Sequence, residues 1–138
     1  TDIVMMLNGA LAGLVAITAE PLTPGPITAM IIGSIGAVIM YYGTKLLENF
    51  GLDDVVGAIP VHMFAGIFGT LVVPLTNADT SFGTQLTGVI SVCVFSFVLS
   101  WITFSTLKST VGLRISRAAE KQGTDKAEVG VIAYSIRD

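Results

Sequence analysis

Charged residues are scarce in this chain of 138 residues: they make up 12% of the sequence, whereas 52% of the residues are hydrophobic. A soluble domain usually carries about 25% charged residues. The chain therefore lacks the polar side chains that would cover a soluble globule of this size, and the lipid bilayer is the solvent that suits it. The single cysteine, Cys93, excludes a disulfide framework within the chain. The small net charge of −3 gives no reason to expect nucleic acid as a partner.

Motifs for catalysis, phosphate binding and targeting are also missing. No nucleophile, base and orienting residue form a catalytic set, no glycine-rich phosphate loop occurs, and the only histidine has no Cys or Glu nearby that would complete a metal site. We therefore expect the protein not to be an enzyme and to need no cofactor. A signal peptide is not expected either. The chain opens with Thr1 and turns hydrophobic almost at once, which we interpret as the sign of a piece of a longer protein.

Four apolar stretches are long enough to cross a membrane, which takes about 20 mostly apolar residues with a range of about 17–25. Short connections containing Pro, Gly or Asp separate them and imply antiparallel neighbours. We predict an all-α fold, a polytopic membrane helix bundle with four transmembrane helices at about 3–19, 27–47, 55–73 and 82–107. Residues 1–108 would form the membrane part, and the more polar residues 109–138 a cytoplasmic tail.

The positive residues predict the orientation, because Lys and Arg are retained in cytoplasmic loops. One of the seven lies between the second and third stretches, and six follow the fourth. The loops after the first and third stretches hold none. The seven are Lys45, Lys108, Arg114, Arg117, Lys121, Lys126 and Arg137. All therefore lie on one side of a four-span chain, which places the C-terminus in the cytoplasm.

His62 is the residue that most strongly indicates a function. It lies seven residues after the start of the third stretch, about 10 Å along a helix that rises 1.5 Å per residue. Ionisable groups at such depth usually face a bundle interior, a cavity or a partner. An imidazole could pass a small polar molecule or a proton. The alternative is a core histidine bonded to a neighbouring carbonyl group.

Three polar residues near the ends of the stretches each allow two interpretations. Asp53 and Asp54 precede the third stretch, where an aspartate caps the first amides of a helix, or where the pair could attract cations to a pore mouth. The hydroxyl of Thr18 bonds its own helix or faces a lumen, and we favour the first.

Pro60 cannot donate a hydrogen bond to the carbonyl group of Val56, so a neighbouring helix or a wet lumen has to satisfy that group.

Three blocks of sequence resemble the ammonium transporter family (Amt/Mep/Rh). Residues 53–70 read DDVVGAIPVHMFAGIFGT. In the family's late segment, a paired aspartate likewise precedes the second of two pore histidines by a fixed interval. Residues 8–19, NGALAGLVAITA, and the tail segment 111–116, VGLRIS, are similar to the corresponding parts of the family in the same order.

The resemblance implies a role for each matching residue. His62 would be the second pore histidine, and Asp54 the aspartate near the cytoplasmic end of the same helix. Thr18 and Ala58 would be pore-facing positions. Gly57 departs from the pattern, since an aspartate is common there in the family.

The resemblance also implies the fold and activity of the whole protein. The family fold has eleven helices, of which the four stretches would be the last, and it assembles as a homotrimer with one pore per subunit in the cell membrane. The family captures ammonium outside, deprotonates it and passes ammonia along the pore. A PII-type regulatory protein would act at the cytoplasmic tail.

Further departures keep two alternatives open. Pro60 and Met63 replace small residues that usually flank the histidine, and residues 129–131, VGV, stand where the family often has histidine, glycine and glutamate. The protein could instead be an ammonium sensor that signals through its tail. It could also be a stand-alone membrane subunit of four helices.

Overall fold

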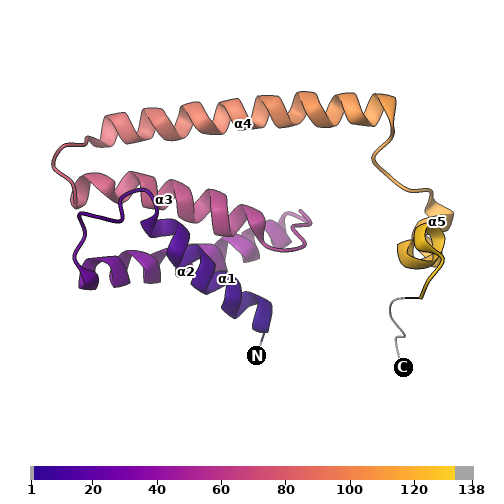
Figure 1. The fold of residues 1–138 in the computed structure, drawn as a ribbon, viewed down its shortest axis with the longest axis horizontal. Helices are drawn as coiled ribbons and strands as arrows, with labels where there is room; N and C mark the ends of the chain where they lie inside the picture. The colour runs from indigo at the N-terminus through magenta and orange to yellow at the C-terminus, as the bar shows by residue number, and fades with distance from the viewer. Residues whose placement is uncertain (1, 133–138) are drawn as a thin grey trace. The chain divides into compact units, whose positions relative to one another are not determined.

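The computed structural model describes residues 2–132, and every regular element in that range is a helix (Figure 1). A helix satisfies its backbone hydrogen bonds internally, as apolar segments in a bilayer require. Arg137 lies outside the described residues. The elements are α1 (Ile3–Ile17), α2 (Pro26–Asn49), the π-helix η1 (Ile59–Phe64), α3 (Ala65–Val72), the 3₁₀-helix η2 (Val73–Leu75), α4 (Phe82–Thr110), α5 (Arg117–Gln122) and the π-helix η3 (Asp125–Val129). The fold is all-α, a partial membrane helix bundle.

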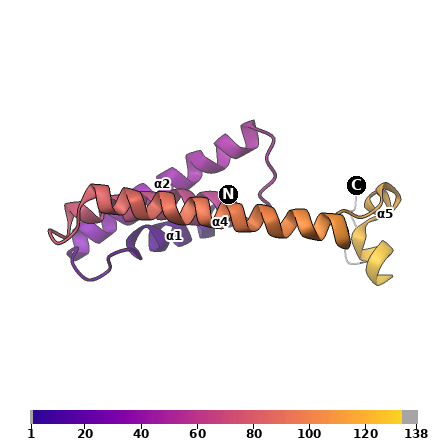
Figure 2. The same cartoon turned by 90° about the horizontal axis from the view of Figure 1, so that it is seen from above.

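Residues 2–94 form one compact unit in which three helical segments pack together. α1 runs antiparallel to α2 and parallel to the continuous segment η1–α3–η2 (Figure 1). Seen from above, α2 runs obliquely to α1 (Figure 2). The core is small: Ala12 of α1, Met40 of α2, Val61 of η1 and Ala65 of α3 are buried against one another.

Glycines bring these helices close together. A Cβ atom on Gly13 would lie 3.1 Å from the carbonyl oxygen of Gly33, so α1 and α2 touch backbone to backbone at this point. Gly69 approaches the backbone of Ala16 even more closely, which joins α3 to α1. Small residues permit this contact between helices in lipid, where packing drives association.

The helix lengths divide into two groups. α2 and α4 are long and apolar enough to cross a membrane, whereas α1 and Ile59–Leu75 are apolar but shorter. α4, with 29 residues, is about 44 Å long and exceeds the roughly 30 Å of the hydrocarbon layer. α1, with 15 residues, is about 22 Å long. The boundary between membrane part and tail at residue 108 stays a prediction.

The third helical segment begins later than the sequence predicts. We expected a helix from residue 55, but the first helical element begins at Ile59. Gly57 has a φ of +74°, a left-handed conformation that interrupts a helix. Pro60 consequently lies in the first turn, the part of a helix in which proline is tolerated. It does not kink the middle of a helix.

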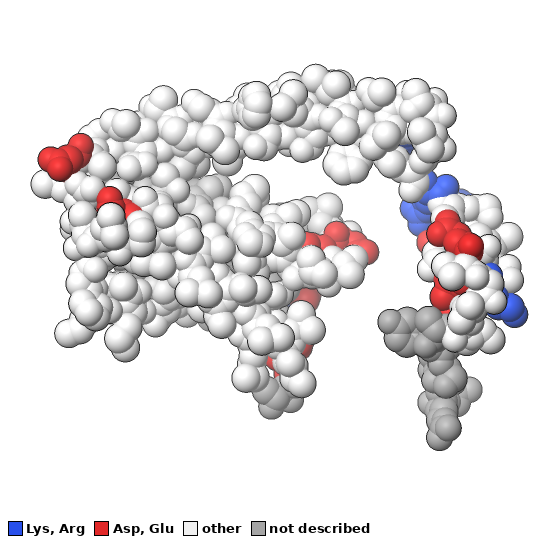
Figure 3. All heavy atoms as spheres, in the orientation of Figure 1, with Lys and Arg blue, Asp and Glu red and all other residues white. Residues whose placement is uncertain are grey.

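The second unit holds the end of α4 and the start of the tail, residues 95–132 of the described range. The Ser116 hydroxyl caps α5 by accepting a hydrogen bond from the Ala119 amide at 3.2 Å. Arg114 and Glu120 form an ion pair at 3.0 Å. Basic side chains of this segment lie among its acidic ones (Figure 3).

Candidate functional site

The start of the third helical segment is held by Asp54. Its Oδ1 accepts a hydrogen bond from the Ala58 amide at 2.9 Å, and its Oδ2 accepts one from the Ile59 amide at 2.8 Å. A carboxylate also suits the positive end of the helix dipole. The capping role considered for Asp54 is therefore confirmed, whereas Asp53 is exposed and makes no capping hydrogen bond among residues 2–132.

A hollow of about 210 Å³ opens beside this cap. It includes both aspartates, so the capping carboxylate also faces open space at the end of the helices. Its lining residues come from the end of α2, the connection that follows and η1: Thr44, Leu47, Glu48, Leu52, Asp53, Asp54, Val55, Gly57 and Pro60. The two interpretations of Asp54, helix cap and pore mouth, are thus compatible with each other.

The carbonyl group of Val56, which Pro60 leaves without a helical donor, bonds to α1. Asn8 Nδ2 donates to this oxygen at a distance of 2.9 Å. Gly57 is buried beneath the same side chain, and a Cβ atom at position 57 would lie 2.6 Å from Asn8 Nδ2. Of the two alternatives for the Val56 carbonyl group, a neighbouring helix and a wet lumen, the structure shows the neighbouring helix.

His62 lies in the middle of the π-helix η1. π-Helical turns are rare and frequently occur at functional sites. Its neighbours Val61 and Ala65 are buried in the core, whereas the His62 side chain is exposed. Ala58, four residues earlier and on the same side of the segment, is exposed as well. Within residues 2–132 no hydrogen bond involves the imidazole ring.

Thr18 lies apart from these residues. Its Oγ1 donates to the carbonyl oxygen of Val15 at 2.7 Å, which confirms that the hydroxyl bonds its own helix. Ala16 approaches Gly69, seven residues beyond His62 and about 10 Å further along the helix. The structure therefore brings Asp54, Ala58 and His62 together at one helix start, and it places Thr18 toward the other end of the bundle.

Sequence reasoning did not assign Asn8 or the hollow to the site. Pro60 predicts that a carbonyl group lacks its helical donor, but the sequence does not indicate which helix supplies the replacement. Within the described range, His, Cys, Asp and Glu side chains form no group of three or more that could hold a metal ion.

A second hydrogen bond joins the residues that follow α1 to those that follow the third helical segment, η1–α3–η2. Asn77 Nδ2 donates to Glu20 Oε2 at 2.8 Å. This hydrogen bond, together with one from the Leu22 amide, lowers the pKa of the Glu20 carboxyl group below its ordinary value of 4.5. A lowered pKa in the folded state means that the charged carboxylate stabilises the fold above the unfolded-state pKa. That contribution is lost as the pH falls through the folded-state value.

We expect Asn77→Leu to lower the thermal unfolding midpoint near neutral pH and to have less effect at an acidic pH below the lowered pKa of Glu20, where its carboxylate is protonated. Thermal unfolding of the detergent-solubilised protein at both pH values tests this. An equal effect at both pH values would show that the charge of Glu20 is irrelevant to this link.

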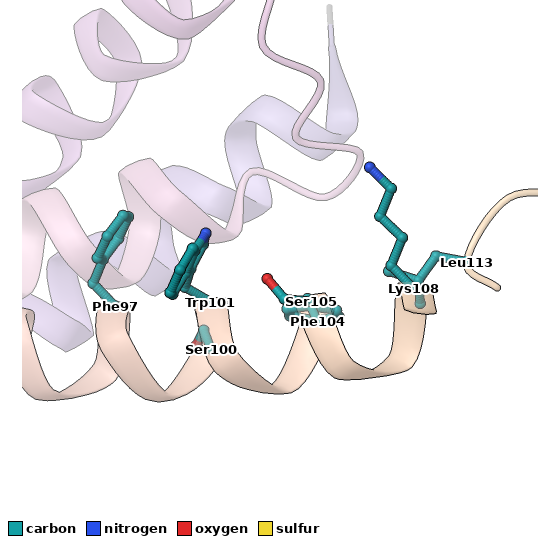
Figure 4. Close-up of a pocket in the computed structure, with 7 residues that line it drawn as sticks. All are labelled: Phe97, Ser100, Trp101, Phe104, Ser105, Lys108 and Leu113. Atoms are coloured by element: carbon teal, nitrogen blue, oxygen red, sulfur yellow. The ribbon is translucent and has the colours of Figure 1, made fainter. Parts of the chain in front are cut away.

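A second hollow, of about 310 Å³, lies along the last turns of α4. Phe97, Trp101 and Lys108 project from one side of the helix (Figure 4). Its other lining residues are Ser100, Phe104, Ser105 and Leu113. Aromatic rings followed by a lysine are typical of a transmembrane helix that reaches the membrane surface.

Comparison with known proteins gives consistent results. The model of the Ammonium Transporter Family matches residues 1–134. The chain is 38% identical over 154 residues to an ammonium transporter of Archaeoglobus fulgidus. This match covers 96% of the present chain and 33% of that protein. It is 32% identical over 144 residues to an ammonium transporter of Corynebacterium glutamicum, covering 94% and 32% respectively. The chain thus spans about a third of the length of these relatives.

Proposed function

Because the chain belongs to the ammonium transporter family, we propose that the protein containing it moves ammonium or ammonia across a membrane. The observation that carries this proposal is His62. The ring is exposed and, in the described part of the chain, unbonded, on a helical segment whose other side is packed against α1 and α2. A histidine in that position can form hydrogen bonds with a small molecule.

The proposed mechanism assigns each residue of the site a task. Ammonium loses a proton before it enters the narrow part of the pore, and ammonia passes along the uncovered side of η1. The proton is either conducted separately or returned to the side from which ammonium came. Ala58 leaves room there because its side chain is small. The His62 ring donates a hydrogen bond to ammonia or accepts one from it, and a neutral imidazole has one nitrogen for each task. Asp54 holds the helix start, and with Asp53 it makes the pore exit acidic.

Thr18 is a proposed pore residue whose hydroxyl already makes a hydrogen bond within its own helix. Its hydroxyl donates to the carbonyl oxygen of Val15. An oxygen that donates in this way still has lone pairs that could accept from a passing molecule. We therefore keep Thr18 as a position toward the opposite end of the pore from Asp54.

Assembly and location are part of the same proposal. We propose a homotrimer in the cell membrane, with the C-terminal tail in the cytoplasm and a PII-type regulatory protein as the partner of that tail. The distribution of positive residues supports the orientation, since the described Lys and Arg side chains lie before the third helical segment or after the fourth span.

Uptake by cells tests the function. Cells that lack their own ammonium uptake, expressing the full-length protein, are expected to accumulate labelled methylammonium and to lose that uptake when excess ammonium competes. Ammonium binding to the purified protein without any flux would contradict transport and would favour the sensor.

A further inference from the structure

Two asparagine side chains join α1 to the third helical segment, one at each end of the parallel pair. Asn8 Nδ2 donates to the Val56 carbonyl oxygen at 2.9 Å. Asn77 Nδ2 donates to Glu20 Oε2 at 2.8 Å. The two hydrogen bonds have the same donor group and nearly the same length. They differ in their acceptors, a backbone carbonyl group for Asn8 and a carboxylate for Asn77, and only the first adjoins the start of η1.

The hydrogen bond of Asn8 is made to a backbone group that the helix itself cannot satisfy. Pro60 has no N–H group for the Val56 carbonyl. An unsatisfied carbonyl group would favour a rearrangement of the first turn. The Asn8 amide removes that tendency, and it occupies the space where a side chain at position 57 would begin.

A short route leads from this contact to His62. Gly57, the residue after Val56, adopts the left-handed conformation and accepts a hydrogen bond from the Val61 amide at 3.1 Å. Val61 is buried in the core and directly precedes His62. The direction of the His62 ring therefore depends on where Gly57 is held, and Asn8 holds it.

We propose that Asn8 is a positioning residue, which fixes the first turn of η1 and thereby the direction of the His62 ring. The consequence of this positioning for transport rests on the proposed function. The effect of Asn8 on the His62 ring does not rest on that function, and the two effects can be measured separately.

The reactivity of the ring gives the direct test. His62 is the only histidine of this chain, and its carbethoxylation by diethylpyrocarbonate can be followed by peptide mass spectrometry in the full-length protein. Leucine matches the shape of asparagine but donates no hydrogen bond. We expect Asn8→Leu to raise the rate at His62 about fivefold, because losing one hydrogen bond increases the population of the opened first turn by about that factor.

A second variant approaches the same contact from the other side. Gly57→Ala adds a Cβ atom 2.6 Å from Asn8 Nδ2, at a residue whose φ of +74° disfavours alanine. We expect Gly57→Ala also to raise the rate of carbethoxylation at His62. If Asn8→Leu does not fold, as judged by its elution from a size-exclusion column, Gly57→Ala and Asn8→Ser decide the question.

Asn77→Leu is the control, since it removes an asparagine hydrogen bond at the other end of the helix pair, where the acceptor is the Glu20 carboxylate. It should leave the rate at His62 unchanged. An equal increase in Asn77→Leu would show that both asparagines merely hold the bundle together, and it would overturn the proposal. An unchanged rate in folded Asn8→Leu and Gly57→Ala proteins would overturn it as well.

Methylammonium uptake separates this inference from the proposed function. If His62→Ala leaves uptake intact, the pore role of His62 fails while the reactivity result stands. If uptake requires His62 and the Asn8 variants leave its reactivity unchanged, the positioning role fails while the function stands.

Discussion

Replacing His62 by alanine is expected to lower methylammonium uptake by the full-length protein about tenfold or more. Alanine offers no hydrogen bond to ammonia at the exposed side of η1. In a site with little water, a lost hydrogen bond of about 1.4 kcal/mol slows a passing molecule about tenfold. Initial uptake rates of labelled methylammonium, normalised to the amount of protein in the membrane, measure the effect.

Two further variants define what the ring does. His62→Gln keeps a donor and an acceptor but cannot carry a proton, so retained uptake would indicate hydrogen bonding and lost uptake a proton relay. Met63→Ala removes the neighbouring side chain, which is 45% exposed on the same π-turn, and should have little effect. Unchanged uptake in His62→Ala at all substrate concentrations would remove His62 from the pore.

Replacing Gly69 by alanine is expected to destabilise the bundle by about 1–3 kcal/mol, the usual cost of an overpacked contact. A Cβ atom at this position would lie 2.8 Å from the carbonyl carbon of Ala16. A backbone atom cannot swing aside as a flexible side chain can. α1 and α3 would have to separate, and the thermal unfolding midpoint in detergent should fall.

Gly88 of α4 provides the matched control, because no atom of the described chain lies within 4 Å of a Cβ atom built there. Gly88→Ala should stabilise α4 slightly, by up to about 1 kcal/mol, since alanine favours helix more than glycine does. A thermal midpoint in Gly69→Ala as high as in Gly88→Ala would mean that α1 and α3 do not pack as described.

The sequence predicts the helices well where hydrophobicity alone decides them. Runs without charge end close to the observed helix ends, for example at Lys45 near the end of α2 and at Lys108 near the end of α4. The cap at Asp54 is likewise predictable, since its carboxylate needs only the amides that follow it along the chain.

Contacts between distant residues could not be predicted in this way. The hydrogen bond from Asn8 to Val56 joins residues 48 positions apart, and no local pattern specifies that pairing. The late start of the third segment has the same origin. Val55 and Val56 are apolar enough for a helix, but the left-handed Gly57 keeps them in a turn where both are exposed. Glycine permits that conformation without requiring it.

The π-turn around His62 changes how this segment should be drawn on a helical wheel. Val61, Ala65, Gly69 and Val73 recur every four residues, and all four are buried. A wheel drawn at 100° per residue would spread these positions over about 120° and break the stripe. The wide turn of η1 takes up part of that drift, because it holds more residues per turn than an α-helix. Any search for this segment by helical periodicity alone would therefore underestimate how one-sided it is.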